Sequence, residues 1–235
     1  MNGGIMIERR SFVHRFAFFC VGGIWVSRSS LADDLSLTPS QTRGPFYPIP
    51  PIDKQQYFDV DLTRKNETAP AADGEMIAVR GKVVDISGQP LHDVIVEVWQ
   101  ACKSGRYNHP NDKNESPLDP NFQYWGRMLT GADGSFAFKT IEPGKYPGRA
   151  PHIHFRVVAP KRKTLETQLY FATNEELNMK DGVYKGVPPK QQKAVTTALE
   201  NLAFNPKDPS SPKMPTGNFQ IVLGSKNDTN STPGM

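Results

Sequence analysis

One stretch does most to indicate how this chain folds: Asp133-Gly-Ser-Phe-Ala-Phe-Lys-Thr-Ile-Glu-Pro-Gly-Lys-Tyr-Pro-Gly-Arg-Ala-Pro-His-Ile-His-Phe155. It opens on Asp133-Gly134, a pair typical of hairpin turns, and continues into the alternating residues 135–141. A turn rich in Pro and Gly then leads into a second apolar run, which begins at His152. The stretch therefore predicts two short strands that are connected by tight turns.

Further strands are expected on both sides of this stretch. Residues 77–86, 94–100, 167–171 and 219–223 have strand patterns, and the second of these places Val94, Val96, Val98 and Gln100 on one face. Residues 190–202 are expected to form a helix, with Ala194, Ala198, Leu199 and Leu202 on one face. These patterns predict an all-β fold: an antiparallel β-sandwich with long irregular arms and at most one short helix.

The N-terminus has the pattern of an export signal. Glu8-Arg-Arg-Ser-Phe-Val13 resembles a twin-arginine motif, an apolar run covers 16–26, and Ser30-Leu31-Ala32 offers small residues for cleavage. The run is short and interrupted by glycine, so a signal peptide is favoured over an uncleaved membrane anchor. We expect a signal peptide at 1–32 and export to the periplasm or medium by the twin-arginine route.

The rest of the chain is expected to form one catalytic domain with flanking arms. Residues 33–75 are rich in Pro, Asp and Thr and predict an extended N-terminal arm. Residues 76–224 are expected to form the β-sandwich catalytic domain, and residues 225–235 a disordered tail. Without residues 1–32 the chain has 24 basic and 23 acidic residues. Such a balance leaves no basic stripe and argues against nucleic acid as a partner.

The histidines at 152 and 154 are the first candidates for chemistry. Residues two apart in a strand point to the same face, so both imidazoles would face one site. Tyr146 and Arg149 lie just upstream on the Pro/Gly turn. Two nitrogen donors, a phenol and a fixed positive charge suggest a metal centre for an anionic ligand. The alternative is a pair of half-buried histidines that backbone carbonyls satisfy.

Three motifs in order along the chain resemble one family. They are Gly105-Arg-Tyr-Asn-His109, Asp133 to Pro147, and Arg149-Ala-Pro-His-Ile-His-Phe155. Together with Thr38-Pro-Ser-Gln-Thr-Arg-Gly-Pro-Phe46, they resemble the intradiol ring-cleavage dioxygenases, and most of all the protocatechuate 3,4-dioxygenase group. The resemblance covers about residues 38 to 172.

The resemblance implies one non-haem Fe(III) per chain, which would be held by Tyr107, Tyr146, His152 and His154. The chemistry of these side chains agrees with a ferric ion, because tyrosinate is a hard anionic donor that suits Fe(III). The implied reaction cleaves a catechol-type ring between its two hydroxylated carbons with O2, to a cis,cis-muconate-type diacid. Tyr146 would also accept a substrate proton.

The resemblance also implies roles around the substrate. Arg149 matches the family residue that stabilises negative charge on the ring, and Gln168 matches a residue near the substrate. Three further residues match the arm that closes the pocket: Thr42, Gly44 and Pro45. The implied partners are a small aromatic diol and O2. We expect an oligomer, formed either by copies of this chain or with a related subunit, and no stable membrane anchor.

Other functions remain open at this point. Only Pro147 and Gly148 separate Tyr146 from Arg149, a shorter insertion than in characterised protocatechuate enzymes, so the substrate is left open. A catalytically silent β-sandwich module that binds iron or catecholate is the main alternative. A cupin-like or copper protein would use the two histidines, but its acidic partner would have to be Glu166, which lies too far along the chain.

Overall fold

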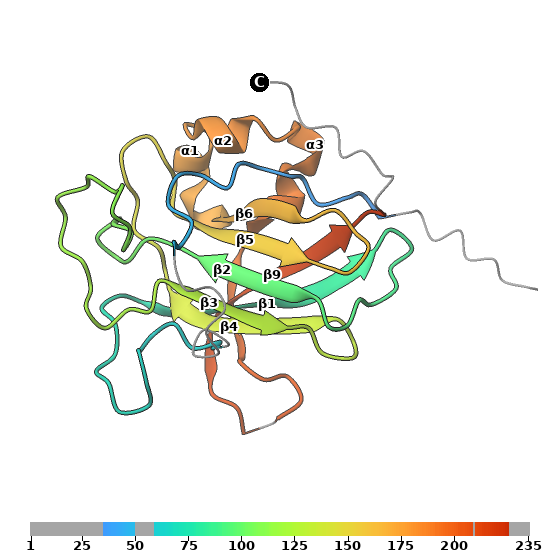
Figure 1. Cartoon of the computed structure of the whole chain (residues 1–235), viewed down its shortest axis with the longest axis horizontal. Coiled ribbons are helices and arrows are strands. Elements are labelled where there is room, and N and C mark those ends of the chain that lie inside the picture. The colour runs from blue at the N-terminus through green and yellow to red at the C-terminus, as the bar shows by residue number, and fades with distance from the viewer. Residues whose placement is uncertain (1–34, 50–58, 209, 226–235) are drawn as a thin grey trace, which may run out of the picture. The chain divides into compact units, whose positions relative to one another are not determined.

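The computed structural model describes residues 35–49, 59–208 and 210–225, which form two β-sheets that enclose a common core (Figure 1). The sheets contain β1 (Met76–Asp85), β2 (Ile95–Trp99), β3 (Trp125–Leu129), β4 (Ser135–Ile141), β5 (His152–Val158), β6 (Leu165–Phe171), β7 (Thr196–Thr197), β8 (Leu199–Ala203) and β9 (Lys213–Leu223). One sheet has the order β4-β1-β9-β8 and the other β3-β2-β5-β6-β7.

The helical elements are short and lie between β6 and β7. They are the 3₁₀ turns η2 (Ala172–Asn174) and η3 (Lys193–Val195) and the helices α1 (Glu175–Asn178), α2 (Gly182–Lys185) and α3 (Pro189–Gln192). The all-β class is confirmed, although three short α-helices occur where at most one was expected. The sheets are also mixed rather than wholly antiparallel, because β9 runs parallel to β1 and β7 runs parallel to β6.

The helix expected over 190–202 is wrong beyond its first turns. Only α3 and η3 are helical, and the chain then enters β7 and β8. Thr196 and Thr197 are β-branched and lose side-chain freedom in a helix, whereas in a strand they pair with the end of β6. The next residues pair with β9. Tertiary pairing therefore overrides the helical spacing of the alanines and leucines.

Most of the expected strands form close to their expected limits. Strand β4 has the expected bounds, β5 begins at the expected residue His152, and β1 and β2 differ from expectation by one residue at each end. Strand β9 begins at Lys213, six residues before the expected start, and β3 was not expected.

The core lies between the sheets and leaves one face of β5 for the site. Ile153, Phe155 and Val157 of β5 belong to this core, and the Phe155 ring meets the Phe219 ring of β9 edge-on at 5.0 Å. Because strand residues alternate between faces, His152 and His154 point away from this core. The sandwich thus supplies a rigid floor beneath the two histidines.

The first described segment of the N-terminal arm, residues 35–49, lies along the five-stranded sheet (Figure 1). The Gln41 amide donates to the Glu166 carbonyl of β6 at 2.8 Å, and the Thr38 amide donates to the Val222 carbonyl of β9 at 3.1 Å. The expected signal peptide and residues 50–58 of the arm lie outside the described residues, as does all but the first residue of the expected tail. Among the residues described, no helix has the length and apolar character needed to cross a bilayer.

Candidate metal centre

The candidate site is built on the outer face of the five-stranded sheet. Strand β5 supplies His152 and His154, and the turn between β4 and β5 supplies Tyr146 and Arg149. Tyr107 comes from the loop after β2, where its amide donates to Asp112 Oδ2 at 2.7 Å. Tyr107, His152 and His154 are each at most 3% exposed. Segments that lie far apart in the sequence therefore place polar groups in one buried space.

The donor atoms of these residues converge. His154 Nε2 lies 3.1 Å from both His152 Nε2 and the Tyr107 hydroxyl, and the last two atoms are 3.4 Å apart. The Tyr146 ring stands edge-on to the Tyr107 ring, with centroids 5.7 Å apart, and its centroid is 5.8 Å from that of His152. The structure thus brings together the four residues that the motifs single out as metal ligands.

The two imidazoles are fixed in different ways. His152 Nδ1 lies 2.7 Å from the Ala150 carbonyl, which can only accept, so Nδ1 carries the proton and Nε2 keeps its lone pair. His154 Nδ1 is buried and has no hydrogen-bond partner in the described structure. Its ring stacks on Trp99 instead, with centroids 4.7 Å apart and planes 8° from parallel.

Burial also sets the protonation of this cluster. Loss of solvent, followed by the nearby Arg149 charge, lowers the pKa of His152 to about 3. Burial and the neighbouring His152 lower the pKa of His154 well below its ordinary value. Both imidazoles are therefore neutral near pH 7, the form that binds metals. Burial raises the pKa of the Tyr107 and Tyr146 phenols above the ordinary value.

The donor set fits a hard trivalent cation. Within the described ranges, no group of three or more His, Cys, Asp or Glu side chains comes together, so a metal at this site would need phenol oxygens. Donors about 2.1 Å from one ion lie roughly 3.0–3.4 Å from each other, which matches the spacing of the three converging atoms. Two anionic oxygens with two neutral nitrogens suit Fe(III), and a bound cation would lower the raised pKa of each phenol.

Arg149 links the phenol to the neighbouring strand. Its Nη1 donates to the Tyr146 hydroxyl at 3.1 Å, its Nη2 donates to Gln168 Oε1, and its Nε donates to Asp181 Oδ2 at 2.9 Å. Burial lowers the pKa of Arg149, but the charges of Tyr146 and Asp181 outweigh burial and raise it. A permanent positive charge therefore lies beside the converging donors.

The expected pocket residues reach the site in part. Gln168 is fully buried in β6, and its Nε2 donates to the Thr42 carbonyl of the arm at 2.9 Å. Gly44 has a φ of +72°, and a Cβ built on it would lie 3.4 Å from His154 Cε1. Pro45, by contrast, is exposed. The arm thus reaches the site at Gly44, beside His154, and at Phe46, whose ring lies 4.9 Å from the Tyr107 ring.

Sequence reasoning missed the role of several neighbours. Trp99 has the sequence pattern of a core residue, because large aromatic residues in strands are usually buried, yet its ring stacks on His154. Asp181 and Tyr170 were not singled out, although both contact Arg149. The only sequence signal for Asp181 is its place before Gly182, typical of a helix N-cap, and this signal carries no information about Arg149.

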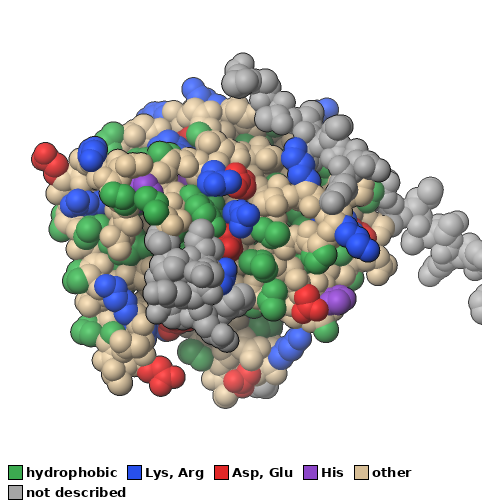
Figure 2. Space-filling view, viewed as in Figure 1, with side chains coloured by type: hydrophobic (Ala, Val, Ile, Leu, Met, Phe, Trp, Pro, Cys, Tyr) green, Lys and Arg blue, Asp and Glu red, His purple; other side chains and the backbone are tan. Residues whose placement is uncertain are grey.

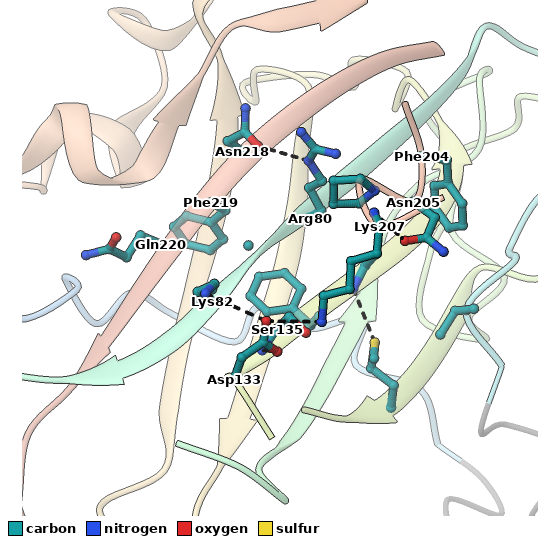
Figure 3. Close-up of a pocket in the computed structure, with 16 residues that line it drawn as sticks. Arg80, Lys82, Asp133, Ser135, Phe204, Asn205, Lys207, Asn218, Phe219 and Gln220 are labelled. Carbon is teal, nitrogen blue, oxygen red and sulfur yellow. Dashed lines mark hydrogen bonds and ion pairs between the residues drawn. The ribbon is translucent and has the colours of Figure 1, made fainter. Parts of the chain in front are cut away.

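Two of the hollows at the surface of the described chain have a bearing on function. One, of about 450 Å³, adjoins the turn that carries Tyr146 and Arg149. Another, of about 630 Å³, opens on the other sheet, where Lys82 and Lys207 both approach Asp133, at 3.7 and 3.4 Å, and Arg80 is held by Asn218 (Figure 3). Within the described residues, the two lysines of this second hollow share one carboxylate, Arg80 meets only neutral groups, and the lining includes no histidine or tyrosine. The face in Figure 2 shows basic and acidic side chains interspersed.

Comparison with known proteins identifies the family. Residues 44–223 match a family model described as Dioxygenase. The chain is 38% identical over 171 residues to the protocatechuate 3,4-dioxygenase beta chain of Burkholderia cepacia. This match covers 63% of this chain and 72% of that relative. It is 31% identical over 163 residues to the protocatechuate 3,4-dioxygenase alpha chain of the same organism, in a match that covers 67% of this chain and 81% of that relative.

More distant matches agree. The chain is 34% identical over 136 residues to a hydroxyquinol 1,2-dioxygenase of Nocardioides simplex, covering 50% of this chain but only 44% of that relative. Among solved structures, the dioxygenase domain of a carbohydrate-binding fusion protein from Streptomyces sp. SirexAA-E is 29% identical, with a TM-score of 0.57, over 81% of this chain and 99% of that one. The chain belongs to the intradiol ring-cleavage dioxygenase family.

Proposed function

We propose that this protein is a non-haem Fe(III) enzyme that uses O2 to open a catechol-type ring between its two hydroxylated carbons, giving a cis,cis-muconate-type diacid. Tyr107, Tyr146, His152 and His154 would hold one ferric ion per chain. The observation that carries this proposal is the convergence of two neutral imidazole nitrogens and a phenol oxygen, 3.1–3.4 Å apart, in a chain of this family.

A bound ferric ion would act as a Lewis acid that draws electron density from a catecholate and makes its ring reactive toward O2. The protein would prepare this centre through its buried donors. His152 presents its Nε2 lone pair because the Ala150 carbonyl holds the proton on Nδ1. The stacked Trp99 holds the plane of the His154 ring.

Tyr146 Oη is the atom that would take up a catechol proton. Without a metal, burial raises its pKa above the ordinary value, so a Tyr146 phenolate that is not held by the ion would be a strong base toward a catechol hydroxyl. Arg149 Nη1, which lies 3.1 Å from Tyr146 Oη, supplies a fixed positive charge at the same place. That charge would stabilise the negative charge that develops on the ring during cleavage.

The substrate would lie between the donor cluster and the N-terminal arm. Gln168, Thr42, Gly44 and Pro45 are the proposed contacts, with Gln168 tied to the Thr42 backbone. The relatives are named for protocatechuate and hydroxyquinol, both aromatics with adjacent hydroxyl groups. We therefore propose a catechol-type aromatic as the substrate class.

We also propose that the protein is exported and oligomeric. The twin-arginine-like pattern of residues 8–13 supports export. The names of the two Burkholderia cepacia relatives, an alpha and a beta chain, support assembly with copies or with a related subunit.

The test is the visible absorption spectrum of the iron-loaded protein, before and after anaerobic addition of catechol. We expect a phenolate-to-Fe(III) charge-transfer band that shifts with catechol, followed by O2 uptake and a ring-opened diacid when air is admitted. Tyr107→Phe should lose or strongly weaken the band, whereas Tyr124→Phe, which alters a buried tyrosine outside the donor cluster, should retain it. A colourless wild-type protein after iron reconstitution would contradict the proposal.

A further inference from the structure

Asp181 is a buried carboxylate that the proposed function does not use. It is 1% exposed, and both of its oxygens are fully engaged. Oδ1 accepts the amides of Val183 and Tyr184 at 2.8 and 3.2 Å, which caps helix α2. Oδ2 accepts Arg149 Nε at 2.9 Å and the Ala150 amide at 3.0 Å. A cap alone would need only the first pair of bonds.

The second pair of bonds fixes the Arg149 side chain. An arginine has several rotatable bonds, and a charge-assisted bond to a buried carboxylate removes most of that freedom. With Nε held by Asp181, the other end of the guanidinium is directed at the Tyr146 hydroxyl and at Gln168. The orientation of the positive charge beside the donor cluster therefore depends on a residue 32 positions later in the chain.

The same carboxylate also acts on the backbone next to His152. It accepts the Ala150 amide, and the Ala150 carbonyl in turn lies 2.7 Å from His152 Nδ1. Asp181 itself is held at the junction of α1 and α2, where its amide donates to the Leu177 carbonyl at 3.0 Å. One helical junction thus supports both an arginine and the peptide that orients a histidine.

We propose that Asp181 is a positioning residue for the reaction: it holds the Arg149 guanidinium in the orientation that serves Tyr146 and the substrate. It acts through Arg149 and does not touch the donor cluster. The kinetic consequence rests on the proposed function, whereas the orientation of Arg149 does not. The two are therefore tested separately.

Two variants test the orientation. Asp181→Asn keeps the volume and one acceptor, and Asp181→Ala removes every acceptor at this position. The control is Val187→Ala, because Val187 is 2% exposed just after α2, so its truncation loosens this region while leaving the carboxylate in place. Thermal unfolding establishes that each variant is folded.

The first measurement uses the metal-free protein. Hydrogen exchange of the Arg149 Nε–H group is followed by NMR, and the resonance is assigned by its loss in Arg149→Lys. We expect protection to fall about tenfold or more in Asp181→Ala, since the bond to the carboxylate is lost, and to persist in Val187→Ala. Unchanged protection in both Asp181 variants would overturn the proposal.

The second measurement uses the iron-loaded enzyme with catechol. We expect Asp181→Asn to lower kcat about 10- to 100-fold with a much smaller change in KM, because the charge of Arg149 is misdirected. In an Arg149→Lys background, the same substitution should change kcat less than about threefold. A full effect of Asp181→Asn in that background would show that Asp181 does not act through Arg149. An inactive wild type would count against the proposed function alone, since the NMR result stands independently.

Discussion

The two histidines of β5 occupy neighbouring positions on one face, yet they are restrained by different physics. A backbone carbonyl restrains His152, whereas the aromatic face of Trp99 restrains His154, and Gly44 of the arm lies beside the His154 ring. A hydrogen bond fixes both the tautomer and the ring, but stacking fixes only the plane of the ring. His154 is therefore the imidazole that should respond most to changes in the arm.

Gly44→Ala should disturb His154. The residue has a φ of +72°, and the added Cβ would lie 3.4 Å from His154 Cε1. Gly148→Ala is the matched control, because its φ is +78° and its Cβ would meet nothing within 4 Å. Both variants should lose about 1 kcal/mol of stability from backbone strain.

Only the Gly44 variant should also shift the visible band of the iron-loaded protein and raise the KM for catechol, by about two- to fivefold. Chemical denaturation measures the loss of stability, absorption spectroscopy measures the shift of the visible band, and steady-state kinetics measures the KM for catechol. Identical spectra for the two variants would show that the arm does not bear on His154.

Acid should destabilise the metal-free protein through these histidines. Burial lowers the pKa of His152 to about 3 and that of His154 well below 6.5. Below pH 6.5 the unfolded chain takes up protons that the folded protein excludes, so stability falls as the pH falls through this range. The slope approaches about 1.4 kcal/mol per pH unit for each histidine.

The measurement is urea denaturation of the metal-free protein between pH 6.5 and 5, above the range in which carboxylates titrate. His154→Gln should remove about half of the histidine contribution to the slope. A slope that is the same in wild type and variant would mean that His154 takes up its proton in the folded protein too.

At the scale of elements, one amide side chain makes two of the hydrogen bonds that dock the N-terminal arm onto β6. Gln41 Oε1 accepts the Gln168 amide at 2.7 Å and the Thr167 hydroxyl at 3.1 Å. The same segment meets Gln168 again through the Thr42 carbonyl. Gln41 thus ties the arm to the strand that carries a proposed substrate contact.

Gln41→Ala should destabilise the protein by about 1–3 kcal/mol, because it leaves the backbone N–H of Gln168 without its hydrogen-bond partner. It should also raise KM more than it lowers kcat, since Thr42 and Gly44 would lose their place over the pocket. Arg43→Ala is the control: this arginine is half exposed, and its ion pair with Glu166 should contribute at most about 1 kcal/mol. Urea denaturation and steady-state kinetics compare the two. An equal or larger loss for Arg43→Ala would indicate that surface charge holds the arm.

Strands could be predicted where alternation and turn residues agree, as in β4 with its Asp133-Gly134 turn. Strand β3 could not, because Trp125-Gly-Arg-Met-Leu129 lacks clear alternation and is defined by its pairing with β2. The expected helix over 190–202 was wrong for a related reason. A short run of apolar residues can match both the helical and the strand period, and pairing with a neighbouring strand decides which structure forms.

At the scale of the whole molecule, the site joins segments that sequence reasoning treats separately. The proximity of Tyr146, His152 and His154 could be predicted because these residues lie close together in the chain, whereas Tyr107 belongs to a separate motif at residues 105–109. The link from Asp181 to Arg149 could not, since it exists only once the helical segment after β6 packs beside the turn before β5. Sequence motifs thus indicate the candidate donors, and the fold specifies what orients them.

A metal bound at the proposed site would stabilise the folded protein by an amount that depends on its affinity. The proposed ligands come from the loop after β2, the turn after β4 and strand β5, so an ion bound by all four would tie these segments together in the folded state alone. A ligand at 100 times its Kd stabilises the folded state by about 2.7 kcal/mol. Iron loading should therefore raise Tm by several degrees, and chelation should reverse the change.

The comparison that decides this prediction is between wild type and Tyr107→Phe, each with and without iron. The variant keeps the buried ring and its packing against Phe46, at 4.9 Å between centroids, and loses only the phenol oxygen. The metal-free forms should therefore unfold at similar temperatures, and only the wild type should gain a large increment from iron. Calorimetry measures both effects. An equal gain in the variant would mean that Tyr107 does not bind the stabilising iron. The loop after β2 would then supply no ligand and would not be tied to β5, so the iron would bind at another site.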